Sequence, residues 1–168
     1  MYAKMSVGLE EAQGAIEAML AEIRSHPEKY AQEAALAVVD ERGKLVAFAK
    51  MDGPAQHIQD IAVRKAWTAA ICRRDTAEMA EFIKIRGYGI DEFLLGGTTV
   101  KAGVAIVDPN EETVTVEDFG ESGWRGKGLG SVSCIGGIGV SRAGPWQLDL
   151  EIAKVGLKHI QHKLWPKK

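Results

Sequence analysis

One lysine lies where an apolar side chain would be expected. Ile58 and Ile61 belong to an apolar stripe at helical spacing, and Lys65 follows them by seven and four residues, inside the same stripe. Thr68 lies further along on the same side. A buried ammonium group must be paired, reach the surface or lose its proton. We therefore predict that Lys65 binds a carboxylate or acts as a base or nucleophile, with Thr68 and Asp52 as ligand-binding neighbours. The alternative is a structural lysine paired with an acid such as Asp52.

Three further side chains are candidates for proton transfer or anion binding. His57 precedes this stripe, and histidine is the side chain that most often serves as a general acid or base. Tyr88, between two glycines, offers a phenol as a proton donor, although a lone loop tyrosine also serves ordinary packing. Arg73, at the predicted helix end, can bind a carboxylate bidentately or simply complement the helix dipole at the surface.

A glycine-rich segment at residues 120–128 contains an aromatic ring and two cations, Trp124, Arg125 and Lys127. Such a loop can fold over a flat anionic ligand by stacking and charge pairing. It is not a P-loop, because the required upstream glycine and the following Ser or Thr are missing. A plain insert or a subunit contact remains the alternative.

Composition excludes several classes of partner. The formal charge of −2 and pI near 6.1 provide no basic field for nucleic acid or an anionic membrane. No apolar run approaches the ~20 residues of a membrane span, and the start lacks a signal-peptide pattern, so we expect a cytoplasmic protein. We expect no metal site, because lysines surround the only closely spaced histidines, His159 and His162.

The pattern of elements predicts one α+β domain over residues 1–168, with an antiparallel sheet and flanking helices. Asp75 is expected to cap a helix through its side chain. The expected elements are helices at 8–25, 56–73, 75–86 and 146–164, a β-hairpin at 34–51, strands at 103–107, 113–119 and 132–140, and a loop at 87–99.

Several motifs, in order along the chain, resemble the GlcG/HbpS/PduO C-terminal family. They are the hairpin segments 37–40 and 51–53, the helix segment 61–76, and the glycine-rich strand 136–141. The resemblance implies a profilin-like or PAS-like fold that assembles as homo-oligomers.

The same resemblance implies a protein that binds a planar anionic ligand, haem-like or an aromatic acid, in a pocket beside the sheet. Haem is the cofactor it suggests, with His57 as a candidate axial ligand. One alternative is a cofactor-independent lyase acting on an aromatic acid such as 4-hydroxylaminobenzoate in aromatic or nitroaromatic catabolism. There Lys65, Arg73 or Arg125 would hold the carboxylate, and His57 or Tyr88 would move protons. A third hypothesis is that the chain is a structural or assembly subunit that binds no small ligand.

The chain departs from the family pattern in three places. Ala102 and Ala105 replace a usual Gly and Pro, and Arg142 follows Ser141 where the family has Gly. Residues 108–131 form an insertion where family members have a short turn. These departures predict a ligand particular to this branch.

Overall fold

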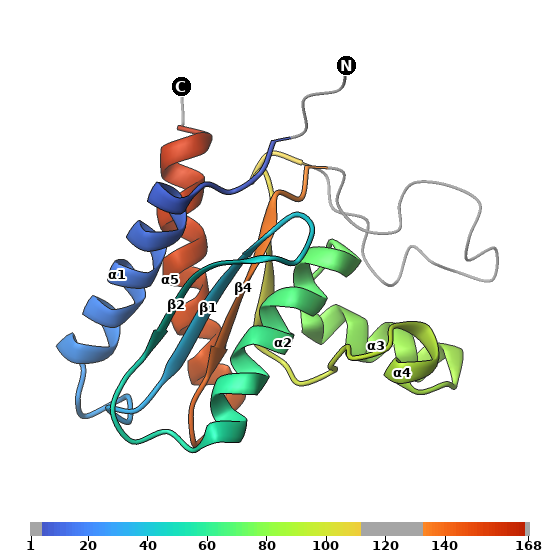
Figure 1. Cartoon of the computed structure of the whole chain (residues 1–168), viewed down its shortest axis with the longest axis horizontal. Coiled ribbons are helices and arrows are strands. Elements are labelled where there is room, and N and C mark those ends of the chain that lie inside the picture. Colours follow the sequence, from blue (N-terminus) through green and yellow to red (C-terminus); the bar gives the residue numbers. More distant parts are fainter. Residues whose placement is uncertain (1–4, 112–132, 167–168) are drawn as a thin grey trace.

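A computed structural model describes residues 5–111 and 133–166 of the chain. This part forms five helices and a four-stranded sheet whose pairings are all antiparallel, which confirms the expected α+β class (Figure 1). The elements are α1 (Leu9–Ser25), β1 (Ala35–Asp40), β2 (Leu45–Lys50), α2 (Gln56–Cys72), α3 (Thr76–Arg86), α4 (Ile90–Phe93), β3 (Gly103–Ile106), β4 (Gly136–Ser141) and α5 (Trp146–Leu164).

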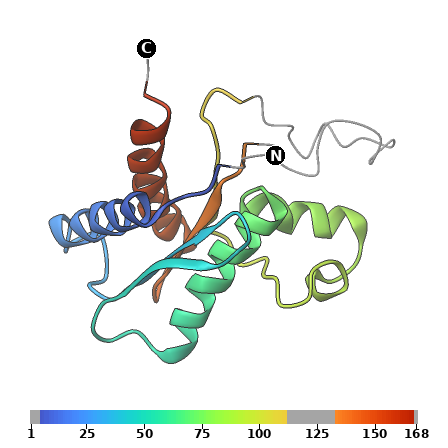
Figure 2. The same cartoon turned by 45° about the horizontal axis from the view of Figure 1, so that its top comes forward.

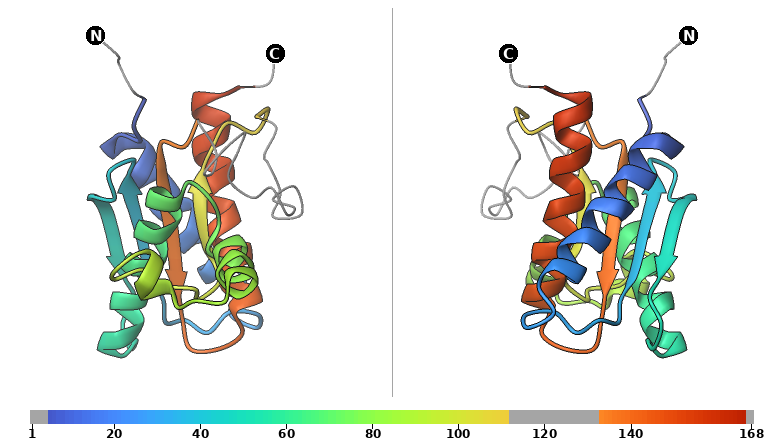
Figure 3. Two further views of the ribbon diagram at one scale, coloured as in Figure 1. Left: turned by 90° about the vertical axis from the view of Figure 1, so that its right-hand side faces the viewer. Right: turned by 90° about the vertical axis from the view of Figure 1, so that its left-hand side faces the viewer.

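The sheet separates two helical layers. Its strand order is β2-β1-β4-β3, and helices α1 and α5 lie side by side on one face while α2 covers the other (Figures 2 and 3). The side chains of strand β1 point alternately toward these two helical layers. Leu36 and Val38 join the core under α1 and α5, whereas Ala37 and Val39 face α2. The larger core therefore lies on the α1–α5 side, and small residues line the α2 side.

Helix α2 lies unusually close to β4 because the contact is made of glycine and alanine. A Cβ atom built on Gly139 would lie 1.9 Å from the carbonyl oxygen of Ala62, and one on Gly137 would lie 2.2 Å from that of Ala66. Only glycine permits such a backbone approach. The close packing brings the Lys65 side chain, on the same helix, within reach of the end of β4.

The outer edge of β3 is covered by side chains at the start of α3. The N–H of Gly103 donates to Thr76 Oγ1 at 2.9 Å, and the N–H of Ala105 donates to Asp75 Oδ1 at 2.9 Å. Asp75 is the N-cap residue of α3, but its side chain makes no capping bond to that helix. The expectation of a side-chain cap was wrong, because the carboxylate satisfies the strand edge instead.

The remaining differences from expectation are local. The expected 87–99 loop contains the short helix α4, and the last strand begins at Gly136 rather than at residue 132. The expected strand at 113–119, and most of the insertion at 108–131, lie outside the described residues. The insertion therefore stays a prediction.

Candidate functional site

A pocket of ≈ 480 Å³ is lined by residues from the end of β4 and the starts of α2 and α5. These three ends lie at the same end of the sheet (Figure 1). This volume is in the range of small-molecule sites. Its wall combines apolar side chains, among them Ile58, Ile61 and Trp146, with the charged and titratable residues considered below. The segments that form it are far apart in sequence, and the sheet brings them together.

Lys65 lies at the inner wall of this pocket and is 1% exposed. Its Nζ donates to the carbonyl oxygen of Val140 at 2.6 Å and to Asp149 Oδ2 at 3.3 Å. The expected inward orientation of Lys65 is therefore present. Its acidic partner is Asp149, in the first turn of α5, and not Asp52.

Arg142 completes a buried cluster of two cations around one carboxylate. Its Nε donates to Asp149 Oδ1 at 3.0 Å, so the two oxygens of Asp149 serve Arg142 and Lys65 separately. The guanidinium carbon lies 5.6 Å from the centre of the Tyr30 ring, a cation–π distance. Arg142 is 6% exposed and lines the pocket.

Burial shifts the two central groups of this cluster toward their neutral forms. It lowers the pKa of Lys65, although the charge of Asp149 opposes the shift. It raises the pKa of Asp149, which the nearby Lys65 and Arg142 oppose. Both directions follow from moving charges out of water. An amine with a lowered pKa beside a pocket is a candidate base or nucleophile.

His57 and Glu33 bring two more titratable groups to the pocket wall. His57 lies in the first turn of α2 with an exposed side chain, and Glu33 lies before β1 and is half-buried. Trp146, in the first turn of α5, adds a flat aromatic surface, and the Lys101 amine lies 4.6 Å from its ring centre. Of the residues expected at the site, the pocket thus brings together Lys65 and His57.

Three other expected ligand-binding residues are not among the pocket-lining residues. Asp52 is exposed in the loop between β2 and α2. Thr68 is buried and accepts a hydrogen bond from the Thr98 N–H at 3.0 Å, which fixes the chain just before Val100 at the pocket wall. Arg73 is the C-cap residue of α2, in the left-handed conformation with φ 55°.

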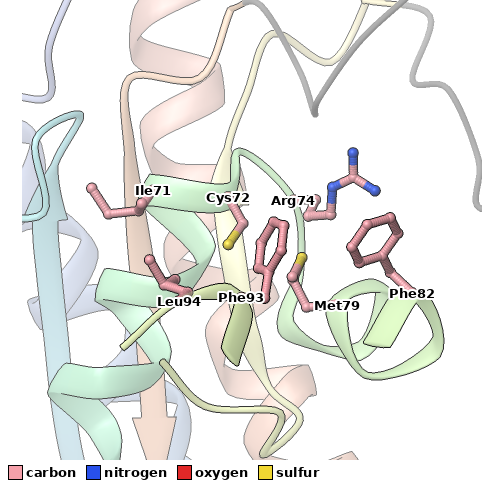
Figure 4. A pocket seen from close by; sticks show the side chains of 7 residues that line it. All are labelled: Ile71, Cys72, Arg74, Met79, Phe82, Phe93 and Leu94. Carbon is pink, nitrogen blue, oxygen red and sulfur yellow. The ribbon is translucent and has the colours of Figure 1, made fainter. Parts of the chain in front are cut away.

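Tyr88 lies in a different part of the molecule, beside a second pocket between α2, α3 and α4. Its ring stacks on Phe93 with centroids 6.3 Å apart. Figure 4 shows this pocket, of ≈ 230 Å³ and mostly apolar, with Phe93, Met79 and Leu94 turned toward it and the sulfur of Cys72 among them. The structure therefore does not bring Tyr88 together with Lys65. Trp124, Arg125 and Lys127 lie outside the described residues, so their expected ligand contacts stay predictions.

Sequence reasoning missed Asp149, Arg142 and Trp146 as site residues. Arg142 stood out in the sequence because it follows Ser141 where the family has Gly, but nothing in the sequence marked it as a pocket residue. Asp149 carried a weaker signal, since an acid in the first turn of a helix is ordinary. In the described part of the chain, no group of three or more His, Cys, Asp or Glu residues is arranged to hold a metal ion. None of the described helices combines the length and apolarity of a membrane span.

The model of haem-degrading HbpS-like proteins matches residues 7–116, more than half of the chain. The chain belongs to the HbpS-like family. This confirms the resemblance seen in the sequence motifs. A comparison with curated proteins gives no significant match.

Solved structures share the fold of this HbpS-like chain. A double mutant of HbpS from Streptomyces reticuli superposes with a TM-score of 0.71 at 21% identity, covering 94% of this chain and 89% of the other. Protein ORFY from Klebsiella pneumoniae gives a TM-score of 0.72 at 18% identity, covering 95% and 94%. A complex of PduOC with haem gives 0.68 at 17% identity, covering 92% and 95%. At these identities the likeness extends to architecture alone.

Proposed function

We propose that the chain binds a planar, anionic small molecule, haem-like or an aromatic acid, in the pocket at the end of the sheet. The observation that carries this proposal is the composition of the pocket wall. A buried cluster holds two cations, Lys65 and Arg142, against a single carboxylate, Asp149, and therefore keeps one net positive charge out of water. The apolar surfaces of Ile58, Ile61 and Trp146 lie next to it. A flat body with one anionic group satisfies both features.

The donor set at this pocket fits haem as well as a smaller acid. His57 would supply an imidazole for the iron, and Arg142 a cation for a propionate group. Bound haem would contribute the redox chemistry of its iron. Membership of a haem-degrading family and the fold shared with a PduOC–haem complex support including haem among the ligands tested.

The test is a binding panel on the purified wild-type protein. Haem is titrated and followed by the Soret band, and benzoate and 2-naphthoate are titrated by calorimetry. We expect saturable one-site binding of at least one of these ligands. The Ile61→Asp variant, which places a charge on the apolar wall, should bind that ligand more weakly than wild type does. The Glu17→Gln variant, altered on the exposed side of α1, should bind it as wild type does. Absence of binding by all three ligands would refute the proposal.

A second candidate function is a lyase acting on an aromatic acid such as 4-hydroxylaminobenzoate. The observation that favours it is that Lys65, whose pKa burial lowers, and His57 line the same pocket. Such a pair can accept and return protons during an elimination or rearrangement. Incubation with 4-hydroxylaminobenzoate and measurement of released ammonium tests this function. We expect His57→Ala to reduce turnover while the fold persists. Turnover that is absent, or equal in wild type and His57→Ala, contradicts it.

A further inference from the structure

We propose that Arg142 is the docking point for the ligand's anionic group, so that the pocket takes an aromatic monocarboxylate which enters carboxylate first. The inference rests on the proposed function and makes it more specific. It names the chemical class of the ligand, the residue that recognises it and the direction in which it lies.

The first step is the unused bonding capacity of Arg142. Its Nε is fixed by Asp149 Oδ1 at 3.0 Å, but its Nη2 is buried and has no hydrogen-bond partner among the described residues. Buried guanidinium donors are almost always satisfied, since an unmade bond to a charged donor is costly. A carboxylate oxygen is the acceptor whose charge and planar geometry suit this group best.

The second step is the charge around that donor. Asp149 is already shared between Arg142 and Lys65, so its single negative charge cannot neutralise both cations. The pocket also lies at the N-terminal ends of α2 and α5, where helix dipoles favour an anion. Glu33 at the wall is the opposing acidic group, and it is half-buried rather than part of the ion-paired cluster. The inner end of the pocket therefore favours one added negative charge.

The third step is orientation. Arg142 and Asp149 lie at the buried end, whereas His57 and the 143–144 segment are exposed. A ligand that inserts its carboxylate toward Arg142 leaves its ring between the apolar wall and Trp146. Nη2 is buried in this structure, so the pocket wall at Arg142 has to open for the carboxylate to reach it. The neighbouring segment contains Gly144, whose φ is 133° and where a Cβ built on the backbone meets no atom within 4 Å. Glycine has the wide range of backbone angles that such a movement needs.

The experiment compares a charged ligand with its neutral isostere. Benzoate and benzamide are titrated by calorimetry into wild type, Arg142→Gln, Arg142→Lys and the surface control Arg42→Gln, whose side chain is 80% exposed. Wild type should prefer benzoate. Loss of a charged hydrogen bond should weaken benzoate binding about 10- to 100-fold in Arg142→Gln and leave benzamide binding unchanged. Arg142→Lys should recover part of the preference, and Arg42→Gln should match wild type.

The outcomes separate this inference from the proposed function. Equal benzoate affinity in wild type and Arg142→Gln, or equal affinity of wild type for benzoate and benzamide, overturns the role of Arg142 while the pocket stays a binding site. Haem binding without benzoate binding overturns the monocarboxylate class alone. No binding of any planar acid overturns both. If both Arg142 variants fail to fold, the wild-type comparison still tests the carboxylate preference, and equal affinities for benzoate and benzamide overturn it.

Discussion

Removing the charge of Asp149 should destabilise the protein more than removing the charge of Lys65. In Asp149→Asn, two buried cations lose the carboxylate that lies 3.0 Å from Arg142 Nε and 3.3 Å from Lys65 Nζ. Breaking a buried ion pair by removing one partner costs about 3–5 kcal/mol. For a chain of this size that free-energy loss lowers Tm by about 6–20 °C.

Lys65→Met leaves a smaller defect. Asp149 keeps Arg142 as a partner, and the main loss is the charged hydrogen bond to the Val140 carbonyl, at a cost of about 1–3 kcal/mol. Replacing the cluster together, as Lys65→Met, Arg142→Met and Asp149→Leu, should restore stability close to wild type. Burying apolar groups in place of a full ionic cluster is often neutral or stabilising.

Thermal unfolding at pH 7, followed by circular dichroism, checks this order of stabilities. The control is Lys29→Met, which removes an exposed ion pair with Glu151 and should leave the unfolding curve unchanged. The reasoning is refuted if Asp149→Asn unfolds with the wild-type midpoint, or if the triple variant is less stable than Asp149→Asn.

Three further predictions concern other parts of the fold. Gly139→Ala, whose new Cβ would lie 1.9 Å from the Ala62 carbonyl oxygen, should cost about 1–3 kcal/mol in urea unfolding. Gly89→Ala, with open space around it, should cost far less, and equal effects would contradict the close packing of α2. Burial raises the pKa of Cys72 to about 11, so its alkylation should be slow at pH 8 and should accelerate as the pH rises toward 11 and the thiolate forms. The folded thiol then holds a proton that the unfolded thiol loses, so between pH 9 and 11 this group makes stability fall as pH rises, and Cys72→Ala should remove its contribution to that slope. Thr76→Val should destabilise by about 1–3 kcal/mol, because the Gly103 N–H loses its acceptor; an unchanged urea midpoint would contradict this.

Local sequence signals predicted the elements well. The helix at 146–164 was placed with its observed bounds, and the hairpin was placed within a residue or two, because apolar periodicity and the Asp40–Gly43 turn are local properties. In that turn Asp40 accepts the Lys44 N–H at 2.8 Å. The inward position of Lys65 followed from periodicity as well.

What the sequence could not supply was the partner of each side chain. Asp149 lies 84 residues from Lys65, so only the tertiary packing of α5 and α2 on opposite faces of one sheet reveals the pair. The Asp75 carboxylate can accept from backbone N–H donors at a helix start or at a strand edge, and the fold decides between them. Tyr88 and Lys65 both have side chains that can transfer protons, but they belong to different elements, and the sequence does not show that these elements are apart.

The unequal sheet edges have a consequence for how copies of the chain can associate. Side chains of Thr76 and Asp75 already occupy the donors of β3, whereas β2 has a single described neighbour, β1. Among the described strands, β2 is therefore the edge that is open to strand addition. Two copies joined through β2 would form a continuous eight-stranded sheet whose outer strands are both β3. The occupied donors of β3 oppose further strand addition, so growth by this route favours a pair over a filament.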